Sequence, residues 1–336
     1  MSTMQGVFYR QTGPPNVLEF GTLPKPEIRP NQVLVRTEAV SVNPIDTYIR
    51  SGAVAADLTN PAIPGCDLAG TVENIGDSVT AFSPGDRVWG SNQSLFGRQG
   101  TFAEYCAVDE EWLYPIPKNV SFESAAAGAL TGITAHLGLF LHAGLQPGEI
   151  VFVNGGSGGV GSAVVQLAKT AGATVITTAG SEDKAAQCRA SGADHVILYR
   201  SEDVIARLTE MTTEIGLINL WFETLRNPEP MNSIPLLARR GRMVLMAGRD
   251  ARPEFPVGPF YVKDLRMLGF AMFNATSEEQ RESAVRLNEL LASTAWNPPI
   301  GAGFTFSEAA AAHRLQEENT LNNAGTLSGK IVLTPR

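Results

Sequence analysis

The sequence is poor in the side chains that build disulfide frameworks and zinc centres. Its three cysteines, Cys66, Cys106 and Cys188, lie far apart in a chain of 336 residues and form no CxxC pair. The four histidines are scattered, and none stands in an HExxH motif or beside a GxSxG elbow. We therefore expect no disulfide framework, no bound metal and no hydrolase site.

Positive charge is also scarce. Lys and Arg number 26 against 34 Asp and Glu, which gives a net charge of −8. An acidic surface repels phosphate backbones, so nucleic acid is not expected as a partner. The first ten residues, MSTMQGVFYR, lack the apolar core of a signal peptide, and no apolar run is judged long enough to span a membrane. These absences predict a cytoplasmic protein without a membrane partner.

The first third of the chain contains short β-type runs set between glycines and prolines. The run 32–42, QVLVRTEAVSV, is rich in β-branched residues, and shorter runs introduced by glycine follow at 70–76, 85–91 and 100–108. This spacing predicts an antiparallel β-domain.

From about residue 122 the pattern changes to alternating strands and helices. An Ala- and Leu-rich stretch with a helical pattern comes first, at 122–144. The expected strands are then 149–154, 173–179, 194–199, 217–222, 241–248 and 265–271, with helices at 159–172, 181–192 and 201–212. Strands that are apolar throughout indicate a parallel sheet covered on both faces. After a helix at 277–293, the last run, 329–335, reads as a strand that rejoins the first domain.

A cluster of glycines follows the strand 149–154. Residues 156–161 read GSGGVG, a GxGxxG pattern between a strand and a helix of a βαβ unit. We expect Gly156 to permit the tight turn, Gly158 to let a pyrophosphate approach the backbone, and Gly161 to let the helix pack closely on the strand. The helix N-terminus offers free N–H groups to the phosphates. A turn that is merely tight is the alternative, and the alternation downstream favours the dinucleotide site.

The residues after the second strand of this region select the nucleotide. NAD sites carry Asp or Glu at the end of that strand to bind the ribose 2′-hydroxyl, but here the strand ends in Thr178 and Ala179. A pocket for a 2′-phosphate can instead be built from Gly180, Ser181, Lys184 and Tyr199. The alternative is that Lys184 is a solvated helix residue. The missing acid favours NADPH over NADH.

Segments spread over nearly the whole chain resemble the medium-chain dehydrogenase/reductase superfamily, and within it the zinc-independent quinone oxidoreductases of the zeta-crystallin type. The segments are SVNPIDTYIRSG (41–52), IPGCDLAGTVENIGDSV (63–79), GDRVWG (85–90), GTFAEY (100–105), LTGITAHLGL (130–139), VNGGSGGVG (153–161), AGSEDK (179–184), VILYRSED (196–203), GRMVLMAG (241–248) and GKIVL (329–333). The resemblance implies an α/β fold. A GroES-like β-barrel-type catalytic domain would span 1–126 and 274–336, and a Rossmann domain with a doubly wound parallel sheet would span 127–273. It also implies NADPH as hydride donor, a quinone or enone as acceptor, and a homodimer or homotetramer.

The resemblance also assigns site residues. The cofactor pyrophosphate would meet Ser157, Gly158, Gly159 and Val160, and the adenosine phosphate would meet Gly180, Lys184 and Tyr199. Other cofactor contacts would be Asn227, Met246, Gly248 and Arg249, with Phe270, Ala271 and Met272 near the nicotinamide. Asn43, Tyr48 and Thr131 would face the substrate cleft, Asn43 and Thr131 also near the cofactor.

Several positions depart from the family pattern. Val54 replaces a frequent tyrosine, Arg249 stands where many relatives have a small residue, and the segment 222–230, FETLRNPEP, replaces a tight turn. Zinc-dependent relatives bind their metal with Cys and His at the places of Asn43 and Cys66. We interpret Cys66 as a small buried hydrophobe.

A reductase of this kind needs little side-chain chemistry, because the cofactor carries the hydride. Charge that develops on the acceptor oxygen needs donors, and we assign the Asn43 amide and the Tyr48 hydroxyl to that role. The alternative reasons for these two residues are the turn before Pro44 and core packing. The hypothesis is an NADPH-dependent quinone reductase that works without a metal. The alternatives are an NADPH-dependent enoyl or alkenal reductase, acting on C=C bonds, and a non-catalytic NADPH-binding protein with a structural or sensing role.

Overall fold

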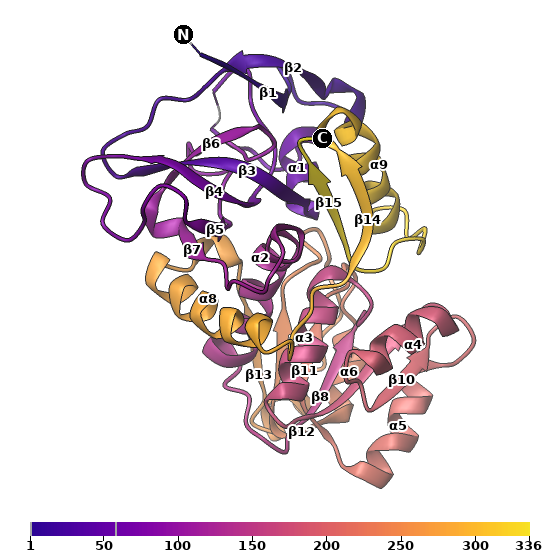
Figure 1. Ribbon diagram of the computed structural model, residues 1–336. Coiled ribbons are helices and arrows are strands. Elements are labelled where there is room, and N and C mark those ends of the chain that lie inside the picture. The colour runs from indigo at the N-terminus through magenta and orange to yellow at the C-terminus, as the bar shows by residue number, and fades with distance from the viewer. Residues whose placement is uncertain (1, 58) are drawn as a thin grey trace. The chain divides into compact units, whose positions relative to one another are not determined.

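The computed structural model describes residues 2–57 and 59–336. The chain divides into two compact units: unit 1 holds Met1–Leu130 and Thr276–Arg336, and unit 2 holds Thr131–Ala275. The boundaries expected from the sequence lie close to these. Unit 1 is therefore built from both ends of the chain, which Figure 1 draws in indigo to magenta and in orange to yellow.

Unit 1 contains a sheet in the strand order β14-β15-β3-β4-β5-β7, with β6 also paired to β3, and a separate pair of β1 and β2. The strands are β1 (Thr3–Phe8), β2 (Glu19–Pro24), β3 (Gln32–Val42), β4 (Asp67–Ile75), β5 (Arg87–Gly90), β6 (Tyr105–Asp109), β7 (Leu113–Pro115), β14 (Ile300–Thr305) and β15 (Lys330–Thr334). Neighbouring strands are antiparallel except for the parallel pair β14 and β15. The antiparallel β-domain expected from the short runs is confirmed.

The strand near the C-terminus extends this sheet. β15 lies antiparallel to β3, with Ile331 opposite Val42 and Leu333 opposite Val40. All four side chains are buried in the apolar core of unit 1. Burial of this apolar surface explains why the run 329–335 rejoins the first domain, as predicted.

Short helices surround the sheet of unit 1. They are α1 (Pro44–Ser51), α8 (Ser277–Ala292) and α9 (Ala309–Thr320), with the turns η1 (Pro15–Val17), η2 (Glu110–Trp112) and η6 (Phe306–Glu308). α1 begins after Asn43 because Pro44 suits the first helical position and the Asp46 carboxylate accepts the Asn43 N–H at 2.7 Å. α8 begins with a capping box in which Thr276 and Glu279 exchange hydrogen bonds.

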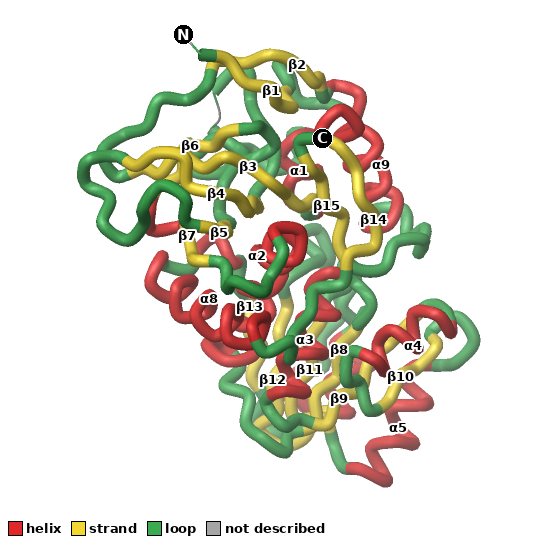
Figure 2. Tube along the Cα trace, in the orientation of Figure 1, coloured by secondary structure: helices red, strands yellow, loops and turns green. Residues whose placement is uncertain are grey.

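Unit 2 is built on a parallel sheet in the order β10-β9-β8-β11-β12-β13. The strands are β8 (Ile150–Asn154), β9 (Thr174–Ala179), β10 (His195–Leu198), β11 (Ile218–Glu223), β12 (Leu237–Leu245) and β13 (Arg266–Gly269). The order reverses between β8 and β11, which is the doubly wound arrangement expected from the sequence. Figure 2 shows the strands of this unit in yellow among its red helices.

The helices of unit 2 follow its strands. They are α3 (Gly159–Thr170), α4 (Glu182–Ala190), α5 (Val204–Ile215), α6 (Pro230–Ser233) and α7 (Val257–Val262), with the turns η4 (Ile234–Leu236) and η5 (Met272–Asn274). α3 packs on β8 and β9, and α4 packs on β9 and β10. β12 begins earlier than the predicted 241–248, because Leu237 pairs with Ile218 before a bulge shifts the register.

One long helical stretch, α2 (Phe122–His136) with the π-helical turn η3 (Leu137–His142), contains the boundary between the units. By length and composition it could cross a membrane, so the expectation that no run is long enough was wrong. Of its most apolar window, 78% is buried inside the protein, and core helices pass the same test. The stretch is therefore weak evidence for a membrane span.

Candidate functional site

The glycine loop between β8 and α3 turns over residues 155–157, which include Gly156. Gly155, not Gly156, has the positive φ, at +88°. A β-carbon on Gly156 would lie 2.1 Å from Thr177 Oγ1, and one on Gly161 would lie 2.0 Å from the carbonyl oxygen of Gly155. Close packing therefore requires glycine at 156 and 161, and backbone conformation favours it at 155.

Gly158 differs from these glycines because the packing of the protein does not require it. It is exposed, it caps the N-terminus of α3, and a β-carbon added to it would lie 3.4 Å from its nearest neighbour, the Gly155 carbonyl oxygen. The open space lies at the start of a twelve-residue helix whose first N–H groups point outward. The loop thus fits a dinucleotide pyrophosphate, with Ser157, Gly159 and Val160 beside Gly158.

The residues expected at a 2′-phosphate come together at the ends of β9 and β10. The Tyr199 hydroxyl would lie 2.5 Å from a β-carbon on Gly180. Ser181 caps α4 and accepts a hydrogen bond from the Lys184 N–H. Burial lowers the pKa of Lys184, and the positive charge of Arg200 lowers it further. Two cationic side chains therefore share this corner, and β9 ends without an acid.

Arg200 was not among the residues assigned from the sequence. It follows Tyr199 directly at the end of β10, so its place could have been found from the same pattern. Like charges repel, so the positive charge of Arg200 disfavours the charged form of Lys184. An anion between them would reverse that repulsion.

The remaining cofactor candidates of unit 2 follow the carboxyl ends of strands. Asn227 comes after β11, Met246, Gly248 and Arg249 come after β12, and Phe270, Ala271 and Met272 come after β13. Gly248 has a φ of +83°, and a β-carbon there would lie 2.4 Å from the Arg226 carbonyl oxygen, so the segments after β11 and β12 touch. All of these candidates lie at the edge of the sheet that carries the glycine loop, where ligands bind in open α/β sheets.

Unit 1 holds a buried polar cluster centred on Asp67, at the start of β4. Its carboxylate accepts hydrogen bonds from Ser41 Oγ, Asn43 Nδ2 and Ser91 Oγ, each at 2.7 Å, and from the Leu130 N–H at 3.2 Å. Its side chain is fully buried. Burial raises the pKa of Asp67, against which the charge of Lys330 and these hydrogen bonds act.

The Asn43 amide lies between two charged groups of this cluster. Its Nδ2 donates to Asp67, and its Oδ1 accepts from the Lys330 ammonium, which also donates to the Val42 carbonyl at 2.6 Å. Asn43 is completely buried. The amide assigned to the acceptor oxygen of a substrate is thus engaged by side chains of unit 1.

Asp46 and Cys66 adjoin the cluster. Burial raises the pKa of Asp46 to about 7; the charge of Asp67 adds to this, and hydrogen bonds from Cys66 and the Asn43 N–H oppose it. Burial raises the pKa of the Cys66 thiol well above its usual value, so the thiol stays protonated, as expected of a small buried residue. Among residues 2–57 and 59–336, no group of three or more His, Cys, Asp or Glu side chains could hold a metal ion.

The other two residues assigned to catalysis lie in different units. Tyr48 is half-buried on α1 in unit 1, and its carbonyl accepts the Val54 N–H at 3.0 Å. Thr131 is buried on α2 in unit 2.

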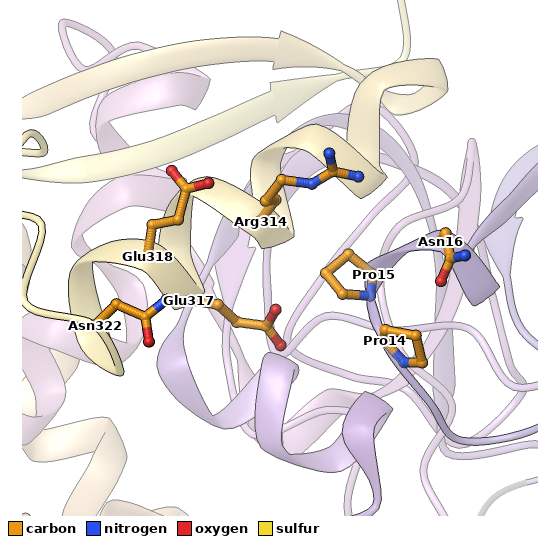
Figure 3. A pocket seen from close by; sticks show the side chains of 7 residues that line it. All are labelled: Pro14, Pro15, Asn16, Arg314, Glu317, Glu318 and Asn322. Atoms are coloured by element: carbon orange, nitrogen blue, oxygen red, sulfur yellow. The ribbon is translucent and has the colours of Figure 1, made fainter.

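A cavity of about 440 Å³ in unit 1, drawn in Figure 3, lies between α9 and the N-terminal segment. It is lined by Pro14, Pro15, Asn16, Arg314, Glu317, Glu318 and Asn322, none of which is a predicted site residue.

Comparison with known proteins matches one family model to the first part of the chain and another to the second. Residues 29–118 match the alcohol dehydrogenase GroES-like domain, and residues 159–289 match the zinc-binding dehydrogenase family. Human quinone oxidoreductase is 31% identical over 331 residues, which cover 98% of this chain and 97% of that protein. The chain belongs to the medium-chain dehydrogenase/reductase superfamily, among its quinone oxidoreductases.

Members of this superfamily with known structures share the fold. The crystal structure of Escherichia coli quinone oxidoreductase complexed with NADPH covers 99% of this chain and 100% of its own, at 27% identity and a TM-score of 0.83. A second relative, 2-methylene-furan-3-one reductase from Solanum lycopersicum, is 38% identical over 209 residues, 60% of this chain and 54% of that protein. The GroES-like and Rossmann domains predicted from the sequence are confirmed.

Proposed function

We propose that the protein is an NADPH-dependent quinone reductase. The observation that carries the proposal is the corner formed by Gly180, Lys184, Tyr199 and Arg200. Here two cations adjoin the end of β9, and β9 carries no acid at the place where NAD sites bind the ribose 2′-hydroxyl. A quinone oxidoreductase relative over nearly the full chain and an NADPH complex of a structural relative support it.

In this proposal the residues of unit 2 bind and orient the cofactor. The N–H groups at the start of α3 bind the pyrophosphate, and Lys184 and Arg200 bind the 2′-phosphate with charge-assisted hydrogen bonds. Bound NADPH supplies the hydride. The protein fixes its position and keeps water away from it.

The acceptor oxygen needs a hydrogen-bond donor, because negative charge develops on it. We propose Tyr48 for this role, because its phenol can both donate and give up a proton. Asn43 keeps its place in the site as a positioning residue. Its amide forms hydrogen bonds with both Asp67 and Lys330. These bonds hold the N-terminus of α1, the helix that carries Tyr48.

The proposed reaction runs without a metal. The side chains at the places of zinc ligands in related enzymes are Asn43 and Cys66, and Asn43 is bound to Asp67 and Lys330. A chelator should therefore leave turnover unchanged. Loss of activity in its presence would contradict this part of the proposal.

We also propose that the protein is a cytoplasmic homodimer or homotetramer. Its cysteines are free and buried, which suits a reducing compartment.

The proposal of an oligomer rests on unit 2. β13 is the end strand of its sheet as described, and α7, which precedes β13, exposes Val257, Tyr261 and Val262 by 64%, 68% and 67%. An unpaired strand edge beside an apolar surface suits a second copy of the chain. A monomeric mass by sedimentation would contradict this.

The test is oxidation of NADPH, with NADH in parallel, against quinones and 2-alkenals in the presence of a chelator. Fast and NADPH-selective turnover of quinones is the expected result. Turnover of 2-alkenals alone would reassign the protein to C=C reduction, which the tomato relative favours. NADPH binding without turnover of any acceptor would support a structural or sensing role instead.

A further inference from the structure

A partly buried hydrogen-bond relay connects the glycine loop to the strands that precede and flank it. Three side chains at the carboxyl ends of adjacent strands take part: Thr178 of β9, Asn154 of β8 and Glu223 of β11. Asn154 and Glu223 stand directly opposite each other in the sheet register. The relay therefore crosses the point where the strand order of unit 2 reverses.

Every hydrogen bond of the relay runs in the same direction. The Gly155 N–H donates to Thr178 Oγ1 at 2.9 Å, the Thr178 hydroxyl donates to Asn154 Oδ1 at 3.1 Å, and Asn154 Nδ2 donates to Glu223 Oε2 at 3.0 Å. Donor–acceptor chains of this kind polarise one another, so each bond strengthens the next. The chain ends on the carboxylate of Glu223, which in its ionised form only accepts hydrogen bonds.

Glu223 is held by two further donors. Trp221 Nε1 donates to its Oε2 at 3.1 Å, and the Leu225 N–H donates to its Oε1 at 2.9 Å. The side chain is 3% exposed. Burial raises the pKa of Glu223, while the three donors favour its ionised form. A group with three donors around it and no acceptor among them fixes the direction of the relay.

The relay acts on the first residue of the loop. Gly155 adopts a φ of +88°, and its N–H is directed to Thr178 inside the unit. The residue after Glu223 adds a second contact, because Thr224 Oγ1 donates to the Asn154 carbonyl at 2.5 Å. The backbone at Asn154 and Gly155, just before α3, is thus held by hydrogen bonds that lead to the end of β11.

We propose that Glu223 is a positioning residue for cofactor binding, which acts through Asn154 and Thr178 to hold the glycine loop in the conformation that receives the pyrophosphate. This inference rests on the proposed use of NADPH and adds a requirement that the glycine motif does not contain. Glu223 touches neither the cofactor nor the substrate. Its effect is on cofactor affinity and not on hydride transfer.

The main test compares the wild type with Glu223→Gln. The new amide group must direct its NH₂ toward Asn154 and Trp221 or toward the Leu225 N–H, so a donor faces a donor in either orientation. We expect the dissociation constant for NADPH, measured by fluorescence titration, to rise roughly tenfold, as for the loss of one hydrogen bond to a charged group. We expect kcat at saturating NADPH to stay within about twofold. A change that weakens only cofactor binding raises KM for NADPH and leaves kcat unchanged.

A second pair of variants tests the relay at its centre. Thr178→Val removes the hydroxyl and should weaken NADPH binding, and Thr178→Ser keeps the hydroxyl and should restore it. The double variant Glu223→Gln/Thr178→Val should have an NADPH dissociation constant no higher than that of the single variant that binds more weakly. The reason is that both changes interrupt the same chain of hydrogen bonds. If Glu223→Gln does not fold, the Thr178 pair decides the question.

Two controls separate the relay from general damage. Trp221→Phe removes one donor to Glu223 but leaves the relay intact, so it should lower the unfolding midpoint in urea without changing NADPH affinity. Glu210→Gln removes an exposed carboxylate of the same unit, with 64% of its side chain accessible, and should change neither. Wild-type affinity in both Glu223→Gln and Thr178→Val would overturn the relay. A wild type that does not bind NADPH would instead overturn the proposed function.

Discussion

The hydroxyl oxygen of Tyr199 lies 2.5 Å from the point where a β-carbon on Gly180 would stand. Gly180 directly follows β9 and Tyr199 directly follows the neighbouring strand β10. Lys184 and Arg200 lie at the same corner. Position 180 must therefore be glycine for the tyrosine to lie where it does. The tyrosine in turn forms one wall of the proposed 2′-phosphate site.

Gly180→Ala should displace the Tyr199 ring and weaken NADPH binding. Because the added methyl group meets the phenol and not the glycine loop, KM for NADPH should rise several-fold while KM for NADH changes less. Steady-state kinetics with both cofactors measure this. Gly303→Ala is the control, since a β-carbon at 303 would meet nothing within 4 Å. An equal rise in KM for NADPH and NADH would mean that the substitution does not act on the 2′-phosphate site.

Lys184→Ala and Arg200→Ala should each reduce the preference for NADPH over NADH. Each cation is expected to contribute a charge-assisted bond to the 2′-phosphate, so KM for NADPH should rise about tenfold or more. KM for NADH should stay near its wild-type value. Lys169→Ala removes an exposed lysine of the same unit, paired with Asp194, and should leave both values unchanged. Equal effects on the two cofactors would contradict the phosphate assignment.

Two glycines of the loop should respond differently to valine. Gly158→Val should abolish NADPH binding and leave the protein folded, because its side chain would occupy the space kept for the pyrophosphate. Gly161→Val should destabilise unit 2 itself, since its β-carbon would lie 2.0 Å from the Gly155 carbonyl oxygen. Circular dichroism and NADPH titration distinguish the two outcomes. NADPH binding by a folded Gly158→Val protein would place the cofactor elsewhere.

Asp46 should make the protein less stable as the pH rises toward neutrality. Burial raises its pKa in the folded protein to about 7, well above the unfolded value, so the folded state binds the proton more tightly. Its contribution to stability is fully present below the unfolded pKa of about 4 and is lost as the pH rises through the folded pKa. The slope can reach roughly 1.4 kcal/mol per pH unit.

Urea unfolding of the wild type and of Asp46→Asn between pH 4 and pH 8 measures this contribution. The difference in unfolding free energy between the two proteins should shift in favour of Asp46→Asn up to about pH 7 and stay constant above it. Asp67, Cys66 and Lys330 are present in both proteins, so their own titration largely cancels. A difference that does not depend on pH would mean that Asp46 is ionised throughout.

The fold was predictable because its signals are local. Apolar strands alternate with helices along the chain, and the run 155–161 marks the turn from β8 into α3. The lack of an acid at the end of β9 could be read from the sequence in the same way. Each of these patterns is complete within a few neighbouring residues.

The details of the site depended on contacts between distant segments. No pattern around Asn43 shows that its amide binds Lys330, which comes from the other end of the chain. The Gly155 N–H donates to Thr178, and the hydrogen bonds continue through Asn154 to Glu223 of a third strand. The glycine motif predicted the loop and its turn, but it does not contain the side chain of Thr178, which accepts the Gly155 N–H.

The late position of β15 in the chain affects the order in which the protein can fold during synthesis. Every strand of unit 2 is synthesised before residue 276, so that unit can fold before the last strand of unit 1 has emerged from the ribosome. The Asp67 cluster is completed only by Lys330, whose charge favours the ionised form of Asp67. A ribosome that stalls before residue 330 would therefore hold a chain whose unit 1 sheet lacks β15 and has an open β3 edge. That intermediate is where chaperones would have the most to protect.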